Sequence, residues 1–238
     1  MRTAYTVFRN LYNVRKMTMK LVLASGSQRR RELLTMCGYD YEIIVSNADE
    51  MIDENDPESF VRALSFRKAK EVFDRLFAVG RRDFAVIGSD TVVAFQKDGE
   101  TKPVIIGKPK DAKDAVRILS MLSGKTHRVF TGVSVIADIT DENAAAQCSI
   151  RKKEEIQTEC SITEVTFETL SPDEITDYVN SGDPLDKAGS YGIQGPFGMF
   201  VREIRGNYFT VIGMPIPVLY KMLKKIGILP HGFYERIE

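Results

Sequence analysis

The sequence predicts an α/β protein with a mixed sheet. Three observations predict it: short apolar runs alternate with helical patterns, several predicted strands follow one another directly, and no internal repeat interrupts this order. Hydrophobic residues make up 43% and charged residues 28% of the 238 residues, as in ordinary globular proteins and unlike disordered chains. A chain of this length can bury a sizeable core without disulfides or metals.

The chain begins with a predicted strand–helix–strand unit. An apolar run at residues 20–24 predicts the first strand, which ends at the Ser-Gly-Ser turn of residues 25–27. Residues 31–37 carry two leucines and a methionine in a helical pattern, and Gly38 is typical of a helix end. Residues 41–45 form the second predicted strand.

A long helix is predicted to begin at Asp56, because this acid precedes Pro57 and apolar residues then recur at helical spacing. Beyond this helix, residues 84–87 and 91–95 are apolar and rich in β-branched side chains. They are predicted as two strands on either side of the segment at residues 88–90.

A hairpin is predicted next, with Asp98-Gly99 as its turn and residues 104–106 as its returning strand. Asp111 is expected to cap the following helix. Residues 129–137 form another predicted strand. The polar, charged stretch at residues 138–155 is expected to form a loop or a hairpin tip.

The last third of the chain is also predicted to contain both strands and helices. Residues 159–167 alternate in the manner of a strand, and residues 171–174 form a capping box with proline at the first helical position. Two further strands are predicted at residues 200–204 and 208–212, and the terminal helix follows Pro215.

Composition excludes several classes of function. Lys and Arg together number 33, as do Asp and Glu, and a formal net charge of zero argues against nucleic-acid binding through bulk charge. No apolar run approaches the roughly 18–20 residues of a membrane span. The three cysteines form no CxxC motif, which argues against a zinc ribbon. The chain has only two histidines, which argues against a Ser/His/Asp triad. We therefore expect neither nucleic acid nor a membrane as a partner.

Residues 1–19 are predicted to be an extension separate from a single domain at residues 20–238. The extension is rich in arginine, and the first acidic residue of the chain is Glu32. This composition is typical of an organellar transit peptide. We favour a disordered or upstream-start extension, because Met17 and Met19 are both available as starts. We expect a cytoplasmic protein, with an organellar location as the alternative.

Two acids are candidates for catalysis. Asp90 stands in an apolar stretch, where burying an ionised carboxylate costs several kcal/mol unless a charged group pairs with it. A structural aspartate in a turn explains Asp90 equally well on this evidence. Glu50 follows the second predicted strand and could reach the same end of the sheet.

Several cations are placed where they could bind phosphate. Three arginines at residues 29–31 follow a Ser-Gly-Ser turn at a helix start, where hydroxyls, N–H groups and guanidinium groups suit a phosphate. Cations there oppose the helix dipole, so a merely solvated turn explains them poorly. Lys68 lies near the apolar face of the long helix, and Lys108 follows a strand on a proline-containing loop. Together with the two acids, these residues are the inventory for metal-assisted attack on a polyphosphate.

Five motifs follow one another along the chain, at residues 23–30, 88–93, 107–109, 122–127 and 186–195. In this order they resemble the Maf family of nucleoside triphosphate pyrophosphatases, first named for septum-formation inhibition. The likeness covers about residues 20–225. The chain departs from the family in its N-terminal extension, in an insertion at residues 138–158, and in Gln28, where the family commonly has proline.

The resemblance implies a Maf/ITPase-like fold, in which an elongated mixed sheet with flanking helices forms two lobes around a central cleft, often in a homodimer. It also implies hydrolysis between the α- and β-phosphates of a nucleoside triphosphate, yielding a monophosphate and pyrophosphate, with Mg²⁺ or Mn²⁺ as cofactor. The Tyr-Gly-Ile-Gln-Gly form of residues 191–195 resembles the branch that acts on dTTP and UTP.

By the same resemblance, Asp90 is the general base or a metal ligand, and Glu50 is a second metal ligand. Lys68 and Lys108 are expected to act beside Asp90 by holding phosphates. The substrate-binding residues that the motifs imply are Ser27, Arg29, Arg30, Thr91 and Gln194.

Two alternatives stay open. The first is a catalytically idle nucleotide-binding protein that regulates cell division, although a module that only binds would not need Asp90 together with Lys68 and Lys108. The second is a pyrophosphatase for another nucleotide, such as 7-methylguanosine triphosphate.

Overall fold

The computed structural model describes residues 19–96, 99–140 and 152–231. The predicted extension therefore lies outside the described residues, except for its last position. Most of the predicted loop or hairpin tip at residues 138–155 lies outside them too. Among the described helices, none is both long and apolar enough to cross a membrane.

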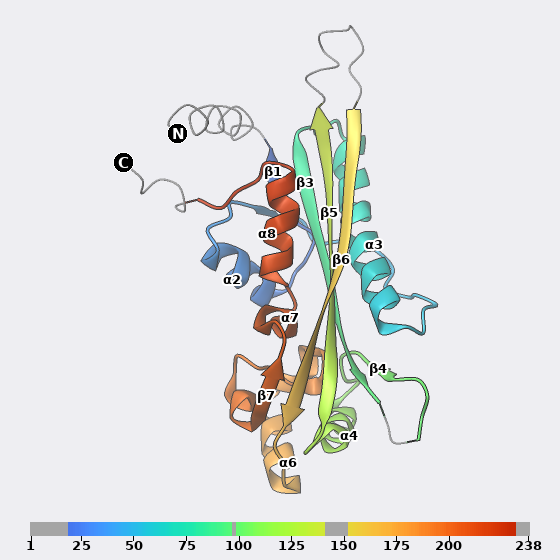
Figure 1. Ribbon diagram of the computed structural model, residues 1–238, viewed down its shortest axis with the longest axis vertical. Helices are drawn as coiled ribbons and strands as arrows, with labels where there is room; N and C mark the ends of the chain where they lie inside the picture. The colour runs from blue at the N-terminus through green and yellow to red at the C-terminus, as the bar shows by residue number, and fades with distance from the viewer. Residues whose placement is uncertain (1–18, 97–98, 141–151, 232–238) are drawn as a thin grey trace, which may run out of the picture.

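One mixed sheet runs along the molecule, and its longest strands lie side by side (Figure 1). The strand order is β2-β1-β3-β5-β6-β7, and β4 also pairs with β3. β1 is parallel to both of its neighbours, whereas the other described pairs are antiparallel. The predicted mixed sheet is thus confirmed. The strands are β1 (Lys20–Leu23), β2 (Glu42–Ile43), β3 (Phe84–Phe95), β4 (Val104–Ile106), β5 (Thr126–Thr140), β6 (Lys152–Phe167) and β7 (Val201–Arg205).

Helices flank the sheet, with α3 on one side of the long strands and α8 on the other (Figure 1). The predicted caps are confirmed for the helices that begin after Asp56 and Asp111 and for the capping box at Ser171, since each side chain accepts a hydrogen bond from a first-turn N–H. The helices are α2 (Gln28–Met36), α3 (Pro57–Ala78), α4 (Ala112–Leu122), α6 (Pro172–Asn180), α7 (Tyr208–Ile212) and α8 (Ile216–Lys225).

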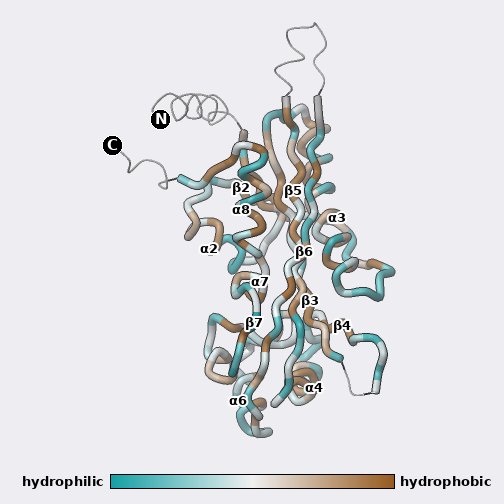
Figure 2. The backbone as a smooth tube through the Cα atoms, viewed as in Figure 1, coloured by the Kyte–Doolittle hydropathy of each residue, from teal (hydrophilic) through white to brown (hydrophobic). Residues whose placement is uncertain are grey.

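The apolar core is divided between two ends of the sheet. At the β1 end, one cluster packs the sheet against α2 and α8, and another packs its opposite face against α3. At the β4 end, a further cluster joins β3, β5 and β6 to α4 and α6. Figure 2 shows the hydrophobic colouring along β3 and β5, which run through both ends. These two ends are the lobes of the molecule.

The predicted pair of strands at residues 84–87 and 91–95 is wrong, because β3 is a single strand of 12 residues. The segment between them does not turn. Gly88 and Asp90 stay in the antiparallel ladder opposite Ser134 and Gly132 of β5. Long-range pairing with β5 therefore overrides the local turn signal, and Asp90 lies in the middle of a strand.

The edge of β3 that faces away from β5 is open over residues 88–92. β1 pairs with this edge up to Ile87, and β4 takes it up again at Val93. β1 and β4 run in opposite directions, and the carboxyl end of each points to the gap between them. Ligands in open sheets bind outside the carboxyl ends of strands at such switch points. The topology thus marks this gap as the place for a site.

Two other predicted elements differ from the structure. Residues 208–212, predicted as a strand, form α7 instead, because the Asn207 side chain caps the Phe209 N–H at 2.8 Å. The segment at residues 138–155, predicted as a loop or a hairpin tip, joins the antiparallel strands β5 and β6, but it is strand at both ends because these strands pair as far as Thr140 and Lys152. Charged residues on a paired strand explain why composition alone suggested a loop.

Candidate active site

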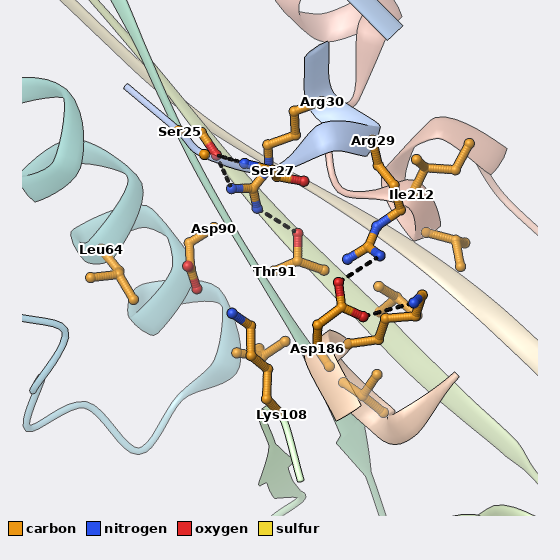
Figure 3. A pocket seen from close by; sticks show the side chains of 18 of the residues that line it. Ser25, Ser27, Arg29, Arg30, Leu64, Asp90, Thr91, Lys108, Asp186 and Ile212 are labelled. Carbon is orange, nitrogen blue, oxygen red and sulfur yellow. Dashed lines mark hydrogen bonds and ion pairs between the residues drawn. The ribbon is translucent and has the colours of Figure 1, made fainter. Parts of the chain in front are cut away.

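A cleft with a volume of about 710 Å³ opens at the gap between β1 and β4. This size suits a small-molecule ligand. The loops after β1 and β4, the inner face of α3 and residues 186–194 all contribute to its lining. Figure 3 shows acidic and basic side chains from these separate elements pointing into one space.

The turn after β1 brings Arg30 into the cleft. Its guanidinium donates hydrogen bonds to Gly213 O at 2.8 Å, to Ser25 Oγ at 3.1 Å and to Thr91 Oγ1 at 3.4 Å. All three acceptors are neutral, so none of them cancels its charge. Burial lowers the pKa of Arg30, and the negative charge of Asp90 opposes that effect. A half-buried guanidinium whose hydrogen-bond acceptors are all neutral keeps its positive charge available to bind an anion.

The same turn presents Ser27 and Arg29. Ser27 is the N-cap residue of α2 but makes no side-chain capping bond, which leaves the first-turn N–H groups open to a ligand. Arg29 points the other way along the cleft and forms an ion pair with Asp186 at 3.4 Å (Figure 3). The adjacent arginines are therefore held differently, one by neutral acceptors and one by a carboxylate.

Two glycines let α3 lie directly against the sheet. A Cβ at Gly88 would stand 2.2 Å from Ser65 O, and one at Gly132 would stand 2.1 Å from Val61 O. Any side chain at either position would push the helix away. Because Gly132 is paired with Asp90 across the ladder, this close approach places α3 beside Asp90.

Lys68 of α3 meets two carboxylates. Its Nζ lies 2.8 Å from Asp90 Oδ1 and 2.7 Å from Glu50 Oε1. The side chains of Lys68 and Asp90 are each only 13% exposed, whereas that of Glu50 is 68% exposed. The hydrogen bond from Lys68 lowers the pKa of Glu50, against the opposing effect of burial. One ammonium thus joins two carboxylates from different segments of the chain.

Lys108 and Thr91 complete this part of the cleft. Lys108 follows β4, is exposed, and points toward Asp90 (Figure 3). Thr91 Oγ1 accepts from Arg30 and lies 2.9 Å from Thr131 Oγ1, which in turn donates to Thr210 O at 2.7 Å. The last bond directs the Thr91 hydroxyl, because Thr131 has used its proton and accepts that of Thr91.

Gln194 lines the far part of the cleft, on the loop at residues 183–195. Its side chain is exposed. The loop beneath it is anchored more firmly: Gly192 is buried, its N–H donates to Tyr178 Oη at 3.0 Å, and Tyr178 itself is buried. The amide of Gln194 therefore stands on a fixed backbone and faces the open space.

His127 supports this loop from inside the core. Its Nε2 lies 3.0 Å from the hydroxyl of the buried Tyr191, and its ring packs edge-on against Phe167. Burial lowers the pKa of His127 to about 3, so the imidazole is neutral at physiological pH. His127 does not line the cleft among the described residues.

The structure brings nine predicted site residues into this one cleft: Ser27, Arg29, Arg30, Glu50, Lys68, Asp90, Thr91, Lys108 and Gln194 all line it. Arg31, the third arginine expected at the phosphate-binding turn, does not line it. Their roles stay predictions. Sequence reasoning assigned no role to three further polar residues near them: Tyr178, Asp183 and Lys187. Only proximity in space shows what these three contact, and Tyr178 in particular carries no motif signal.

The cleft lining combines five cations with three carboxylates, namely Arg29, Arg30, Lys68, Lys108 and Lys187 against Glu50, Asp90 and Asp186. An excess of cations favours a polyanion such as a polyphosphate. The carboxylates that meet on Lys68 could in addition hold a divalent cation or receive a proton from water. The arrangement can thus bind a polyphosphate and activate water against it.

Comparison with known proteins gives a consistent result. A family model described as "Maf-like protein" matches residues 20–226. A protein of Agathobacter rectalis named "dTTP/UTP pyrophosphatase" is 40% identical over 217 residues, which covers 88% of this chain and 98% of that protein. A Bacillus thuringiensis protein of the same name is 42% identical over 210 residues, covering 88% of this chain and 96% of that protein.

Among solved structures, the Ham1 protein of Staphylococcus aureus is similar with a TM-score of 0.46 and 14% identity. The match covers 87% of this chain and 98% of that one. At this identity and TM-score, the likeness carries nothing about activity.

Proposed function

The chain belongs to the Maf-like protein family, and on that premise we propose that it hydrolyses nucleoside triphosphates, dTTP and UTP in particular. The products are the nucleoside monophosphate and pyrophosphate. Such a reaction removes nucleotides from the cellular pool before they are used. The bacterial relatives that carry the name dTTP/UTP pyrophosphatase match this chain over 88% of its length.

One observation carries the proposal: Lys68 joins Asp90 and Glu50 in a cleft that also receives Arg29, Arg30 and Lys108. A protein that only binds a nucleotide needs the cations, and the half-buried carboxylate of Asp90 would oppose binding of a phosphate. The same carboxylate is useful when water must lose a proton. The pairing of acid with base therefore favours an enzyme over an idle nucleotide-binding regulator.

The residues present fit a divalent metal ion. Glu50 and Asp90 each place an oxygen within 3 Å of the same ammonium, so one positive charge already bridges them. Magnesium in phosphate-binding sites takes one or two carboxylates and completes its coordination with water and substrate oxygens. Glu50 and Asp90 would hold Mg²⁺ or Mn²⁺, which, when bound, neutralises charge that develops on the phosphate oxygens.

The side chains divide the chemical step among them. Arg30, Arg29 and Lys108 bind the triphosphate and orient its α-phosphorus toward Asp90. A carboxylate oxygen of Asp90 takes a proton from water as the water oxygen bonds to the α-phosphorus, and the bond to the oxygen that bridges to the β-phosphorus breaks. That bridging oxygen leaves with pyrophosphate. Lys68 holds the Asp90 carboxylate in place through its hydrogen bond at 2.8 Å.

Gln194 is proposed to select the base. Its amide offers one acceptor and two donors, which match the N3–H and a neighbouring carbonyl of thymine or uracil. Cytosine presents an acceptor at N3 and an amino group at C4, so the same amide mismatches it. A site that hydrogen-bonds its substrate can discriminate by up to ~10⁴-fold, although the open position of Gln194 favours a smaller factor.

The test is a nucleotide panel with product identification. The protein is incubated with Mg²⁺ or Mn²⁺ and dTTP, UTP, CTP, GTP, ATP or 7-methylguanosine triphosphate, and the products are separated by ion-exchange chromatography. We expect monophosphate and pyrophosphate from dTTP and UTP, and no turnover with a chelator. Orthophosphate as the first product would contradict the assigned bond. A best substrate other than dTTP or UTP would favour the second alternative, and no hydrolysis at all would favour the idle regulator.

A pair of glutamine variants separates base selection from binding in general. Gln194→Ala should reduce the preference for dTTP over CTP more than it reduces turnover of CTP. Gln28→Ala is the matched control, because Gln28 also lines the cleft but lies at the phosphate-binding turn and bonds to Glu32. An unchanged preference in Gln194→Ala would contradict the assignment of Gln194 and leave that of Asp90 intact. The homodimer and the cytoplasmic location stay predictions.

A further inference from the structure

A continuous polar network connects the loop that carries Gln194 to Arg29. It begins at the buried N–H of Gly192, two residues before Gln194, which donates to Tyr178 Oη at 3.0 Å. The Tyr178 hydroxyl then donates to Asp183 Oδ2 at 2.5 Å. One tyrosine thus joins the loop backbone to a carboxylate at the other end of the same loop.

Lys187 extends this network toward the phosphate-binding turn. Its Nζ donates to Asp183 Oδ1 at 3.0 Å, to Asp183 O at 2.6 Å and to Asp186 Oδ1 at 2.7 Å. The second oxygen of Asp186 lies 3.4 Å from Arg29 Nη1. The ammonium of Lys187 has one hydrogen for each of its three contacts, and Asp183 and Asp186 each use separate carboxylate oxygens for their two partners, so the bonds do not compete with one another.

Packing restrains the network at Lys187 and Gly192, whereas the Asp186 side chain is 68% exposed. The Lys187 side chain is only 13% exposed, and a Cβ at Gly192 would stand 2.7 Å from Lys187 Cε. Gly192 is therefore pressed against the lysine stem, and a larger residue would displace one of them. Burial raises the pKa of Asp186, but the hydrogen bond and charge of Lys187 outweigh this effect and lower it overall. The carboxylate stays ionised between its two cations.

From this geometry we propose that Tyr178, Asp183 and Lys187 are positioning residues for base selection, which hold the Gln194 loop at a set distance from Arg29. The proposal rests on the proposed function, since it concerns how a nucleoside triphosphate is read in the same cleft. When the loop is held, the base must reach Gln194 while the phosphates reach Arg29. When the loop is released, the cations still bind the phosphates, but Gln194 is no longer held in position to hydrogen-bond the base.

The central variant is Tyr178→Phe, which removes one hydroxyl and leaves every charge of the cleft in place. We expect the ratio of kcat/KM for dTTP to that for CTP to fall roughly five- to tenfold, as for the loss of one or two buried hydrogen bonds. Inhibition by inorganic tripolyphosphate, which lacks a base, should stay within twofold. Tyr41→Phe is the matched control, because Tyr41 hydrogen-bonds to Arg31 O outside the cleft.

A double-mutant cycle tests whether Tyr178 acts through Gln194. In the Gln194→Ala background, Tyr178→Phe should leave the dTTP to CTP ratio unchanged, since the group that it positions has been removed. A general loss of stability would lower turnover of dTTP and CTP by the same factor and would leave the ratio unchanged in both backgrounds. If Tyr178→Phe does not fold, Asp183→Asn provides the same comparison, because Asp183 accepts from both Tyr178 and Lys187 and does not line the cleft.

The outcomes separate this proposal from the proposed function. If the wild-type protein prefers dTTP and Tyr178→Phe keeps that preference, only the positioning role is overturned. If both variants weaken tripolyphosphate inhibition as much as they weaken dTTP turnover, the network supports the whole cleft and the role in base selection is wrong. A wild-type protein that does not distinguish dTTP from CTP overturns both.

Discussion

The cleft has two ends that are built in different ways. The charged end, formed by Ser25, Arg30, Lys68 and Asp90, stands on the end of β1, the middle of β3 and the inner face of α3. The loop end, residues 183–195, contains two short 3₁₀ turns, with left-handed backbone at Gly182 before the first turn and at Gly189 within the second. Regular elements hold the first end, whereas hydrogen bonds between side chains hold the second.

This difference in construction determines which groups each end offers to a ligand. At the charged end, Arg30 is held by neutral acceptors, so its charge is available to an anion. At the loop end, Asp183, Asp186 and Lys187 largely neutralise one another, and the polar group offered to a ligand is the exposed amide of Gln194. Under the proposed function, the charged end would supply affinity and chemistry, and the loop end would supply the choice of base.

The largest effect is expected at the charged end, from Asp90→Asn. The amide keeps the shape of the side chain but cannot accept the proton of water, so turnover should fall by roughly 10²- to 10⁴-fold. Steady-state release of pyrophosphate measures it, with circular dichroism to confirm folding. Asp74→Asn is the matched control, because Asp74 pairs with Lys70 on α3 and does not line the cleft. Near wild-type turnover in folded Asp90→Asn would remove Asp90 from the mechanism.

A smaller effect is expected from Arg30→Lys. An ammonium cannot satisfy the three acceptors of the guanidinium and also meet a phosphate, so kcat/KM should fall by roughly 10- to 100-fold, the value of a charged hydrogen bond. The fall should be equal for dTTP and CTP, since this end does not read the base. Arg31→Lys, next in the chain but outside the cleft lining, should stay within twofold. A changed dTTP to CTP ratio in Arg30→Lys would contradict the proposal that the charged end takes no part in selecting the base.

The smallest effect concerns His127, which supports the loop end from the core. Its pKa is about 3 in the folded protein against an ordinary 6.5, so the unfolded chain binds the extra proton between these values and stability falls as the pH drops. Between pH 7 and pH 5 the loss from this residue should be about 2 kcal/mol.

Urea unfolding of the wild-type protein and of His127→Gln at both pH values measures this loss. The variant should show a smaller decrease, because it has no group to protonate. His231→Gln, which changes the other histidine of the chain, should keep the wild-type decrease. Equal decreases in all three proteins would show that His127 does not make the loop end sensitive to acid.

Local sequence determined many of the elements correctly. The caps at Asp56, Asp111 and Ser171 act on the nearest helical turn, and such contacts depend on residues three or four positions away. The five motifs contain seven of the nine predicted site residues that line the cleft, and Glu50 and Lys68 lie outside them. The failures occurred where a distant partner decided the outcome. The predicted break between two strands at residues 88–90 is absent, because β5 pairs with this segment.

What the sequence alone determined is therefore the set of chemical groups and the short-range signals that begin and end the helices. The tertiary structure alone decided that β1 and β4 leave a gap along β3, that Gly88 and Gly132 bring Lys68 onto Asp90, and that Tyr178 joins the loop to the network. The physical reason is the separation along the chain of the residues that interact. A cap forms within one helical turn. Lys68 and Asp90 are 22 residues apart, so their ion pair exists only after the helix and the strand that carry them have packed together.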